Sequence, residues 1–264
     1  MKFITELPTA LRVGFFLATR QLEDLSQKIE KNTEFQITSL GNLSETQHLV
    51  KLPKFFATKT NGQVISYNRE SEKFEDGVLK VNKEIKSSIH IKDGLLAIYT
   101  GSSLVIWDSN TNTLGSEFST SVPTEENSAG IKYYPTNSRV YVIDKANSQI
   151  INFLVTGNSI NRPVVSLKTP ELLKAQDFAI DGSVYILNEN GIVKFQAGNL
   201  AEFNMPVLAK PFFGKGKIYT EINYKNLYLM DPENKRILVM DKTGELLNTL
   251  QSPQLDKMLD FYVD

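Results

Sequence analysis

Three acidic residues are the candidates for metal-dependent chemistry in this sequence. Asp177 and Asp260 occupy equivalent positions at the start of expected inner strands, and Glu221 falls near another strand of that kind. Carboxylates that converge from separate repeats could hold a divalent cation and activate water. The second and third repeats offer no comparable acid, so a metal-dependent hydrolase stays an alternative. The sequence predicts no bound cofactor.

A cluster of basic and aromatic residues is the candidate for ligand or partner binding. Lysines in such a cluster could hold phosphate, and phenylalanines could stack a base, which keeps single-stranded RNA binding as a second alternative. The competing interpretation is a solvated loop whose phenylalanines pack between repeats, and the sequence favours it. The cluster consists of Lys210, Phe212, Phe213, Lys215 and Lys217, with Arg162 in the corresponding connector one repeat earlier.

Nucleophilic catalysis has little support in the sequence. Cysteine is absent, and His48 and His90 are the two histidines. A Ser-His-Asp triad would need one of them beside an exposed serine and an acid, and no Gly-x-Ser-x-Gly elbow occurs. We therefore expect structural roles for both histidines.

Charge and hydropathy exclude further classes of function. The 264 residues include 29 Lys and Arg against 30 Asp and Glu, and this balance gives no general attraction to nucleic acid. The N-terminal apolar stretch Val13–Ala18 is too short for a membrane span or for the core of a signal peptide. A cytoplasmic location is slightly favoured.

The N-terminal residues show a helical pattern of apolar side chains. The spacing predicts an amphipathic helix within residues 1–34 as a separate segment. We expect it to pack on the rest of the protein, although a partner helix or a coiled coil also satisfies the spacing. The pattern is formed by Leu11, Phe15, Ala18, Leu22, Leu25 and Ile29.

Residues 35–264 contain a repeated hairpin. Each copy is an alternating apolar strand, a turn rich in Gly, Asn or Asp, and a second strand. The copies recur every 40–45 residues or so, which leaves room for four strands per repeat and is typical of a β-propeller. The predicted fold is all-β, with five to six four-stranded blades. The hairpins are Phe56–Tyr67, Leu96–Trp107, Val140–Phe153, Val184–Phe195 and Leu227–Met240.

The sequence allows two arrangements of the last blade. Residues Thr169–Asp181 align without gaps with Ser252–Asp264, so the chain ends on an expected inner strand. Either that strand closes a five-bladed ring beside the first hairpin, or a sixth blade is incomplete. The second solution is slightly favoured, with Phe35–Thr38 as an outer strand of that blade.

The turns of two hairpins carry matching polar residues. Side chains of this type commonly bond backbone groups within a turn, so we expect a structural role for them. The residues are Asp144 and Asn147 in one turn, and Asp231, Asn234 and Arg236 in the other.

Residues 226–247 resemble an NHL repeat. Asp231, Asn234, Arg236, Ile237, Asp241 and Gly244 match the family pattern Asp-x-x-Asn-x-Arg-Ile and Asp-x-x-Gly, and Gln149 replaces the arginine in the third repeat. Residues 130–264 also resemble propellers of PPM-type phosphatase-like proteins from small-genome bacteria, although no phosphatase module is present. The resemblance implies a binding platform for protein or RNA, with some six-bladed relatives acting as hydrolases or lyases.

The sequence as a whole favours a non-catalytic propeller that recognises a protein partner. Blades place loops from distant parts of the chain on one surface, which suits recognition without chemistry. The central hydrolase and the RNA binder remain the alternatives.

Overall fold

The computed structural model describes residues 2–7, 10–19, 35–42, 46–51, 55–59, 61–68, 73–120, 130–212, 216–255 and 258–263. These residues form strands, apart from loops and the short 3-10 turns Pro135–Asn137, Pro170–Lys174 and Pro253–Leu255. They belong to two compact units: unit 1 comprises residues 1–44 and 176–264, and unit 2 comprises residues 45–175.

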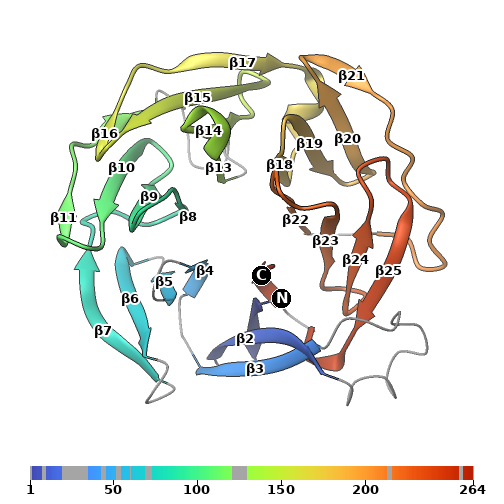
Figure 1. Ribbon diagram of the computed structural model, residues 1–264, viewed down its shortest axis with the longest axis horizontal. Helices are drawn as coiled ribbons and strands as arrows, with labels where there is room; N and C mark the ends of the chain where they lie inside the picture. Colours follow the sequence, from blue (N-terminus) through green and yellow to red (C-terminus); the bar gives the residue numbers. More distant parts are fainter. Residues whose placement is uncertain are drawn as a thin grey trace. The chain divides into compact units, whose positions relative to one another are not determined.

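Unit 2 contains three antiparallel sheets built from consecutive parts of the chain (Figure 1). The first has four strands, and each of the others has five because its outer position is shared by two short strands. The sheets are β4 (Thr46–Lys51), β5 (Phe55–Lys59), β6 (Gln63–Asn68) and β7 (Lys73–Lys80); β8 (Ser87–His90), β9 (Leu95–Tyr99), β10 (Ser103–Asp108), β11 (Thr113–Leu114) and β12 (Phe118–Ser119); and β13 (Ile131–Tyr134), β14 (Arg139–Asp144), β15 (Gln149–Thr156), β16 (Ser159–Ile160) and β17 (Val164–Lys168).

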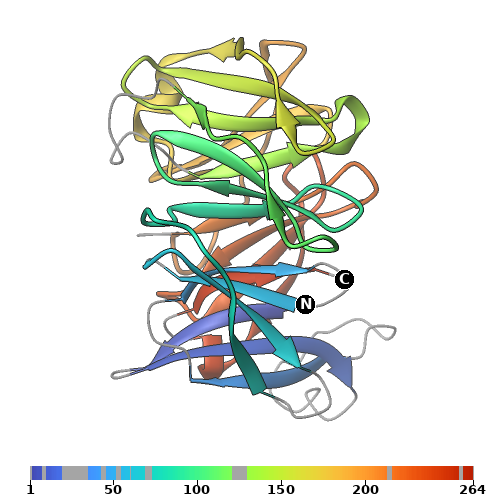
Figure 2. The ribbon, with the colours of Figure 1, turned by 90° about the vertical axis from the view of Figure 1, so that its left-hand side faces the viewer.

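Unit 1 also contains three sheets, each of four strands. One of them combines both ends of the described chain, and its red strand lies among the blue strands in Figure 2. The sheets are β26 (Met258–Tyr262), β1 (Lys2–Leu7), β2 (Ala10–Thr19) and β3 (Phe35–Asn42); β18 (Asp177–Ile180), β19 (Ser183–Asn188), β20 (Gly191–Gln196) and β21 (Asn199–Ala201); and β22 (Lys217–Tyr219), β23 (Leu227–Asp231), β24 (Arg236–Met240) and β25 (Leu246–Gln251).

All five predicted hairpins are present. Four of them pair at the predicted ends: Leu96 with Trp107, Val140 with Phe153, Val184 with Phe195, and Leu227 with Met240. In the remaining hairpin Tyr67 pairs with Phe55, one residue from the predicted Phe56.

In four sheets the central turn and the connector that leaves the sheet lie on the same rim. The carbonyl of the central hairpin turn accepts a hydrogen bond from the backbone N–H just beyond the outer strand. This contact repeats in four sheets at 2.8–3.2 Å, from Val81 to Gly62, Thr120 to Ser102, Thr169 to Ser148, and Ser252 to Lys235. The connector that leaves each of these sheets is therefore fixed where it passes the turn.

The apolar core lies between neighbouring sheets of each unit. In unit 2 the ring of Trp107 meets the ring of Phe56 edge-on, with centroids 5.3 Å apart. In unit 1 Leu187 and Leu229 belong to one buried cluster that joins the β18–β21 and β22–β25 sheets. Burial of each such side chain contributes about 1.5–3 kcal/mol, so neighbouring sheets stabilise one another.

The predicted N-terminal helix is wrong. Residues 10–19, which contain the first half of the helical pattern, form β2 and pair with β1 and β3. The same stretch also has an alternating pattern, with Leu11, Val13, Phe15 and Leu17 at every second position, and pairing on both sides selects this period. Leu22, Leu25 and Ile29 lie outside the described residues. The predicted boundary after residue 34 falls between β2 and β3 of one sheet.

The predicted incomplete last blade is also wrong. β26 pairs with β1, so its sheet has four strands, and Phe35–Thr38 lies in the outer strand β3 as expected. The sequence favoured a blade that lacks the strands after residue 264, whereas the hairpin of β1 and β2 pairs beside β26. Two sheets have five strands, which corrects the expectation of four in every blade. The count of five to six blades around one axis stays a prediction.

Replacing Phe261 in β26 tests this sheet. Phe261 is 5% exposed and packs against Tyr219 and the buried cluster of unit 1, so Phe261→Ala should lower the free energy of unfolding by about 3–5 kcal/mol. Urea unfolding measures the loss, and Leu200→Ala, at a 68% exposed position, should change stability by less than about 0.5 kcal/mol. Equal losses in the two variants would contradict the described packing.

Candidate functional site: the connector of residues 202–216

The connector between β21 and β22 in unit 1 is the strongest candidate for a functional site. Its described residues, 202–212 and 216, form neither helix nor strand. In Figure 1 the orange segment that leaves β21 passes beside β25. Connections longer than about 12 residues without regular structure are uncommon in compact domains, and they often carry function.

Three hydrogen bonds fix the connector against the neighbouring sheet. The backbone N–H of Asn204 donates to the Thr243 carbonyl at 2.8 Å. Arg236 Nη2 donates to the Lys210 carbonyl at 2.5 Å, and Asn234 Nδ2 donates to the Pro211 carbonyl at 3.0 Å. Because three of its backbone groups are held, this long loop loses little further conformational freedom when it binds a partner.

A buried ion pair in the β23–β24 turn positions two of these donors. Asp231 is fully buried, and its Oδ2 accepts a hydrogen bond from Arg236 Nε at 2.7 Å and one from Asn234 Nδ2 at 2.9 Å. A carboxylate that accepts several bonds from a guanidinium and an amide holds both side chains in one orientation. The three residues bond one another, as the sequence predicts, and they also hold the connector.

The corresponding turn in unit 2 bonds its own residues. Asp144 Oδ2 accepts hydrogen bonds from Asn147 Nδ2 at 2.7 Å and from Gln149 Nε2 at 3.0 Å. Gln149 stands where the other turn has Arg236. The amide of Gln149 has one nitrogen, whereas a guanidinium has three and can reach a further acceptor with a second nitrogen.

Val207 and Lys210 are exposed side chains of the connector, as are Glu202, Asn204, Ala209 and Pro211. Val207 is fully exposed, and Lys210 is exposed with no carboxylate within ion-pair distance among the described residues. In contrast Phe203, Met205 and Leu208 turn inward and pack against the buried cluster that joins two sheets. The sequence analysis missed Val207, because its cluster began at Lys210; the signal was an apolar residue in a stretch with no strand period.

Phe212 packs in the core, which is the arrangement that the sequence favoured over base stacking. Phe212 is 7% exposed and belongs to the core of unit 1. A Cβ on Gly216 would lie 2.6 Å from its ring, so the ring covers the backbone of Gly216 and cannot stack a base. Phe213 and Lys215 lie outside the described residues.

The other predicted basic residues do not join this site. Lys217 begins β22, and its Nζ lies 3.2 Å from Asp260 Oδ1 in an ion pair. Arg162 is exposed in unit 2, between the short strands β16 and β17. Both strands pair with β15, so Arg162 does not lie in a connector between sheets, as the sequence analysis expected.

The three predicted metal ligands have other contacts. Asp177 is 5% exposed, and its Oδ2 accepts a hydrogen bond from the backbone N–H of Ile218 at 3.0 Å. Glu221 Oε1 accepts a hydrogen bond from the hydroxyl of Tyr219 at 2.7 Å. Among the described residues no group of three or more acidic or histidine side chains could hold a metal ion, and this corrects the predicted convergence of these residues. The hydrogen bond of Asp177 to Ile218 instead joins β18 to β22. In unit 2 Ser87 joins β8 to β13 in the same way, because its Oγ accepts a hydrogen bond from the N–H of Ile131.

His90 ends β8 in unit 2 and is half-buried. Its Nε2 is buried and has no hydrogen-bond partner among the residues that the structure describes. Burial lowers the pKa of His90 below its ordinary value, although the charge of Asp93 opposes the shift. His48 lies in β4, and its side chain is outside the described residues.

A cluster of charged groups joins two sheets of unit 1. Lys242 Nζ lies 2.6 Å from Asp181 Oδ2, donates to Thr220 Oγ1, and stands 5.7 Å from the centre of the Tyr185 ring. Burial lowers the pKa of Lys242, and burial with Asp181 nearby raises the pKa of Tyr185. These groups satisfy one another, so the cluster stabilises the contact between sheets and offers no open position to a substrate.

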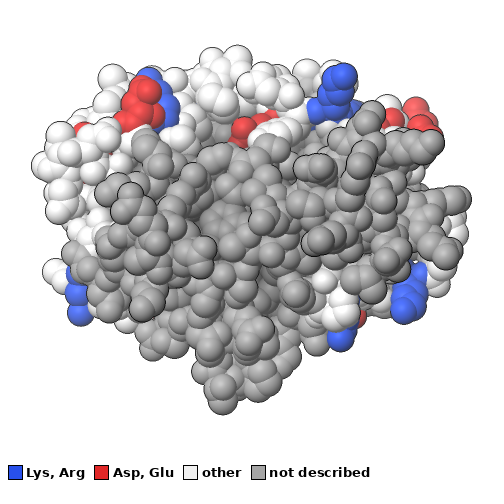
Figure 3. Space-filling view, turned by 60° about the horizontal axis from the view of Figure 1, so that its bottom comes forward, with Lys and Arg blue, Asp and Glu red and all other residues white. Residues whose placement is uncertain are grey.

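In the view of Figure 3, both blue Lys and Arg side chains and red Asp and Glu side chains lie on the described part of the surface. The formal net charge of the sequence is −1, which gives no general attraction to a nucleic-acid backbone. A search of the described residues found no helix of the length and hydropathy needed to cross a membrane.

Comparisons with solved structures identify the fold. A chain of the nidogen/laminin complex has a TM-score of 0.63 and 10% identity, over 97% of this chain and 95% of that one. Virginiamycin B lyase from Staphylococcus aureus has a TM-score of 0.56 and 14% identity, over 80% of this chain and 71% of that one. The protein has a β-propeller fold. The sequence matches no protein-family model and no curated protein.

Arg236→Ala tests how the connector is held. The change leaves the buried Asp231 carboxylate without its cation, so we expect a loss of about 3–5 kcal/mol in stability and faster hydrogen exchange at residues 204–212. The matched change Gln149→Ala removes a neutral donor and should cost about 1 kcal/mol. Unchanged exchange in the connector of Arg236→Ala would contradict this assignment.

The stability of the protein should fall in mild acid because of His90. The folded pKa of His90 is below the unfolded value of 6.5, so the unfolded state takes up the proton first as the pH falls. The stability that neutral His90 contributes is fully present above pH 6.5 and is lost as the pH falls below that value. Urea unfolding between pH 7 and 5.5 measures this dependence, which His90→Leu should largely remove. An equally steep dependence in His90→Leu would refute the assignment.

Proposed function

We propose that the protein is a non-catalytic propeller that binds a protein partner through the connector of residues 202–216. The observation that carries the proposal is the exposure of Val207 and Lys210 on a loop fixed by three hydrogen bonds. An apolar side chain and a cation without an ion-pair partner, held three residues apart, form a contact that needs no reordering on binding.

Further apolar exposure on neighbouring elements supports this surface. Among the described residues of unit 1, most of the exposed large apolar side chains belong to the connector or to the strands that precede it and pass beside it. The residues at this surface are Val207 in the connector, Leu200 in β21 and Leu247 in β25. The other exposed large apolar residue described in unit 1 is Ile222. Exposed apolar residues that gather in this way are typical of interaction surfaces.

The exposed groups also indicate the chemistry of the partner. Val207 gains from contact with an apolar side chain, because the contact removes both surfaces from water. Lys210 gains from a carboxylate, because no acidic group among the described residues neutralises it. We therefore expect the partner to offer an apolar side chain next to an acidic one.

The observations favour this function over the two alternatives. The hydrolase would need Asp177, Glu221 and Asp260 together, and each has another contact. RNA binding would need an accessible ring at Phe212, which is buried. Nidogen/laminin and virginiamycin B lyase share the fold with this chain, and at 10% and 14% identity the likeness extends no further.

Site-specific photo-crosslinking tests the proposal. A photoreactive residue at position 207 should form one dominant adduct in extracts of the cells that make this protein. The protein identified in that adduct, once purified, should bind Val207→Asp and Lys210→Glu at least about tenfold more weakly than the unchanged chain in calorimetry, a difference of about 1.4 kcal/mol.

Val164 provides the matched control, since it is a valine of unit 2 with 53% exposure. Val164→Asp should bind the partner as the unchanged chain does. The proposal fails if the two connector variants bind with unchanged affinity, or if position 164 yields the same adduct as position 207.

A further inference from the structure

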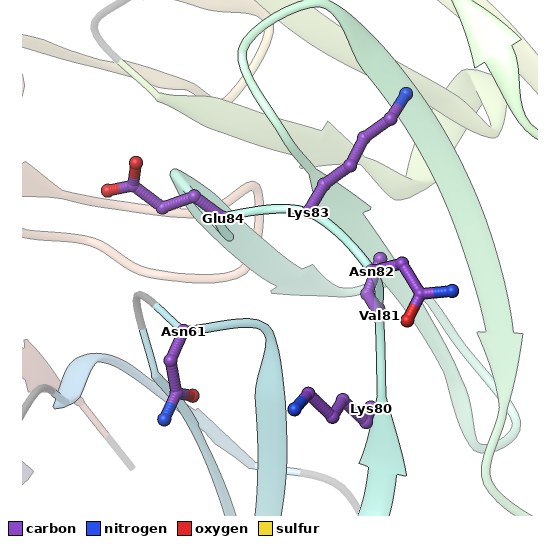
Figure 4. Close-up of a pocket in the computed structure, with 6 residues that line it drawn as sticks. All are labelled: Asn61, Lys80, Val81, Asn82, Lys83 and Glu84. Atoms are coloured by element: carbon purple, nitrogen blue, oxygen red, sulfur yellow. The ribbon is translucent and has the colours of Figure 1, made fainter.

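Unit 2 contains a pocket that the partner-binding connector does not use. Its volume is about 530 Å³, within the range of roughly 300–1,000 Å³ that small-molecule sites occupy. Figure 4 shows the six residues that line it: Asn61, Lys80, Val81, Asn82, Lys83 and Glu84. They come from the β5–β6 turn, the last residue of β7 and the connector to β8.

The two walls of the pocket are fixed to each other at Gly62. The N–H of Val81 donates to the Gly62 carbonyl at 2.8 Å. A Cβ at Gly62, where φ is +86°, would lie 2.1 Å from the Val81 carbonyl oxygen, so the turn and the connector approach this closely only with glycine there. The pocket is therefore formed before any ligand arrives.

Among the described residues, the charges at the pocket leave Lys80 without an ion-pair partner. Lys83 pairs with Glu117, and Glu84 pairs with Lys86 at 2.8 Å. Lys80 is exposed, and no carboxylate in the described part of the chain lies within ion-pair distance of its ammonium group. In Figure 4 the Lys80 side chain extends into the space that it shares with the amide of Asn61.

Asn61 is held at this wall by its own turn. Its Oδ1 accepts the backbone N–H of Gln63 at 3.1 Å, and its Nδ2 donates to Gln63 Oε1 at 3.1 Å. These bonds fix the amide plane opposite Lys80 without a rearrangement of the loop. In Figure 4 Lys83 and Glu84 extend in other directions, which leaves Lys80 and Asn61 as the side chains that face this space.

We propose that this pocket binds one oxyanion group, the carboxylate or phosphate of a small polar molecule or of a chain end. The ammonium of Lys80 supplies the charge, and a strong oxygen acceptor is the group that it lacks. The pocket is larger than a carboxylate or phosphate alone, and most of its lining side chains are polar, so the rest of the ligand is polar as well. The site belongs to unit 2 and does not depend on the proposed partner of the connector in unit 1.

Nuclear magnetic resonance titration of the full chain tests the site. The probes are N-acetylglycine, its neutral counterpart N-acetylglycinamide, and inorganic phosphate. N-acetylglycine or phosphate should shift the amide signals of residues 61–63 and 80–84 with saturation, and the one that saturates at lower concentration identifies the source of the oxyanion. N-acetylglycinamide should bind at least about tenfold more weakly than N-acetylglycine, because it has no charge for Lys80.

Two variants locate the charge that holds the probe. Lys80→Gln should weaken binding of the anionic probe at least about tenfold. Asn61→Asp should weaken it similarly, because aspartate keeps the hydrogen-bond acceptor of the turn but adds a negative charge that repels the anion. Lys92→Gln, which removes another exposed lysine of unit 2, should bind normally. Absence of saturable shifts with both anions, or equal binding by Lys80→Gln and the unchanged chain, would overturn the proposal.

Discussion

Burial of the inner strands on both faces is the constraint on which the rest of this structure depends. Every residue of β9 and of β24 is buried, although these strands belong to different units. A strand that is covered on both sides needs a neighbour on each face of its sheet. A four-stranded sheet of this protein could not stay folded alone, because one apolar face would remain in water.

This packing also determines where the polar contacts lie. The inner strands of neighbouring sheets come close enough for Ser87 to accept the N–H of Ile131, and for Asp177 to accept the N–H of Ile218. Further out, the connectors of four sheets leave over the central turn, and turn carbonyls accept their N–H groups. Each of these connectors is therefore fixed to its sheet at the turn.

The hairpins could be predicted from the sequence because their signals are local. Alternating apolar residues and a turn of Gly, Asn or Asp occur within about fifteen residues, and the structure pairs Val184 with Phe195 as that pattern requires. The N-terminal strands could not be predicted from the sequence, because the apolar residues of 10–19 fit both a helical and a strand period. Their partner β26 lies at the other end of the sequence, so the contact that decides between the two periods is not local.

The candidate site shows the same limit of local patterns. The turn residues Asp231, Asn234 and Arg236 were recognisable as a motif, and their mutual bonds follow from their types. Their bonds to Lys210 and Pro211 depend on a connector more than twenty residues earlier, which no spacing within the turn reveals. The packing of Phe212 was favoured from the sequence, whereas its close approach to Gly216 was not, because a lone glycine carries no such signal.

One substitution between two equivalent turns shows how a repeated fold acquires a single specialised surface. Asp144 and Asp231 receive similar bonds from the next asparagine, at 2.7 and 2.9 Å, so the turn itself does not require arginine. Arg236 differs from Gln149 in having Nη2 available after Nε has bonded the aspartate, and this second group reaches the Lys210 carbonyl. The cost of burying a guanidinium is offset by Asp231, and the gain is a fixed position for a loop that would otherwise be long and free. A binding surface can therefore arise on one sheet of a propeller through a single residue that the equivalent turn of another sheet lacks.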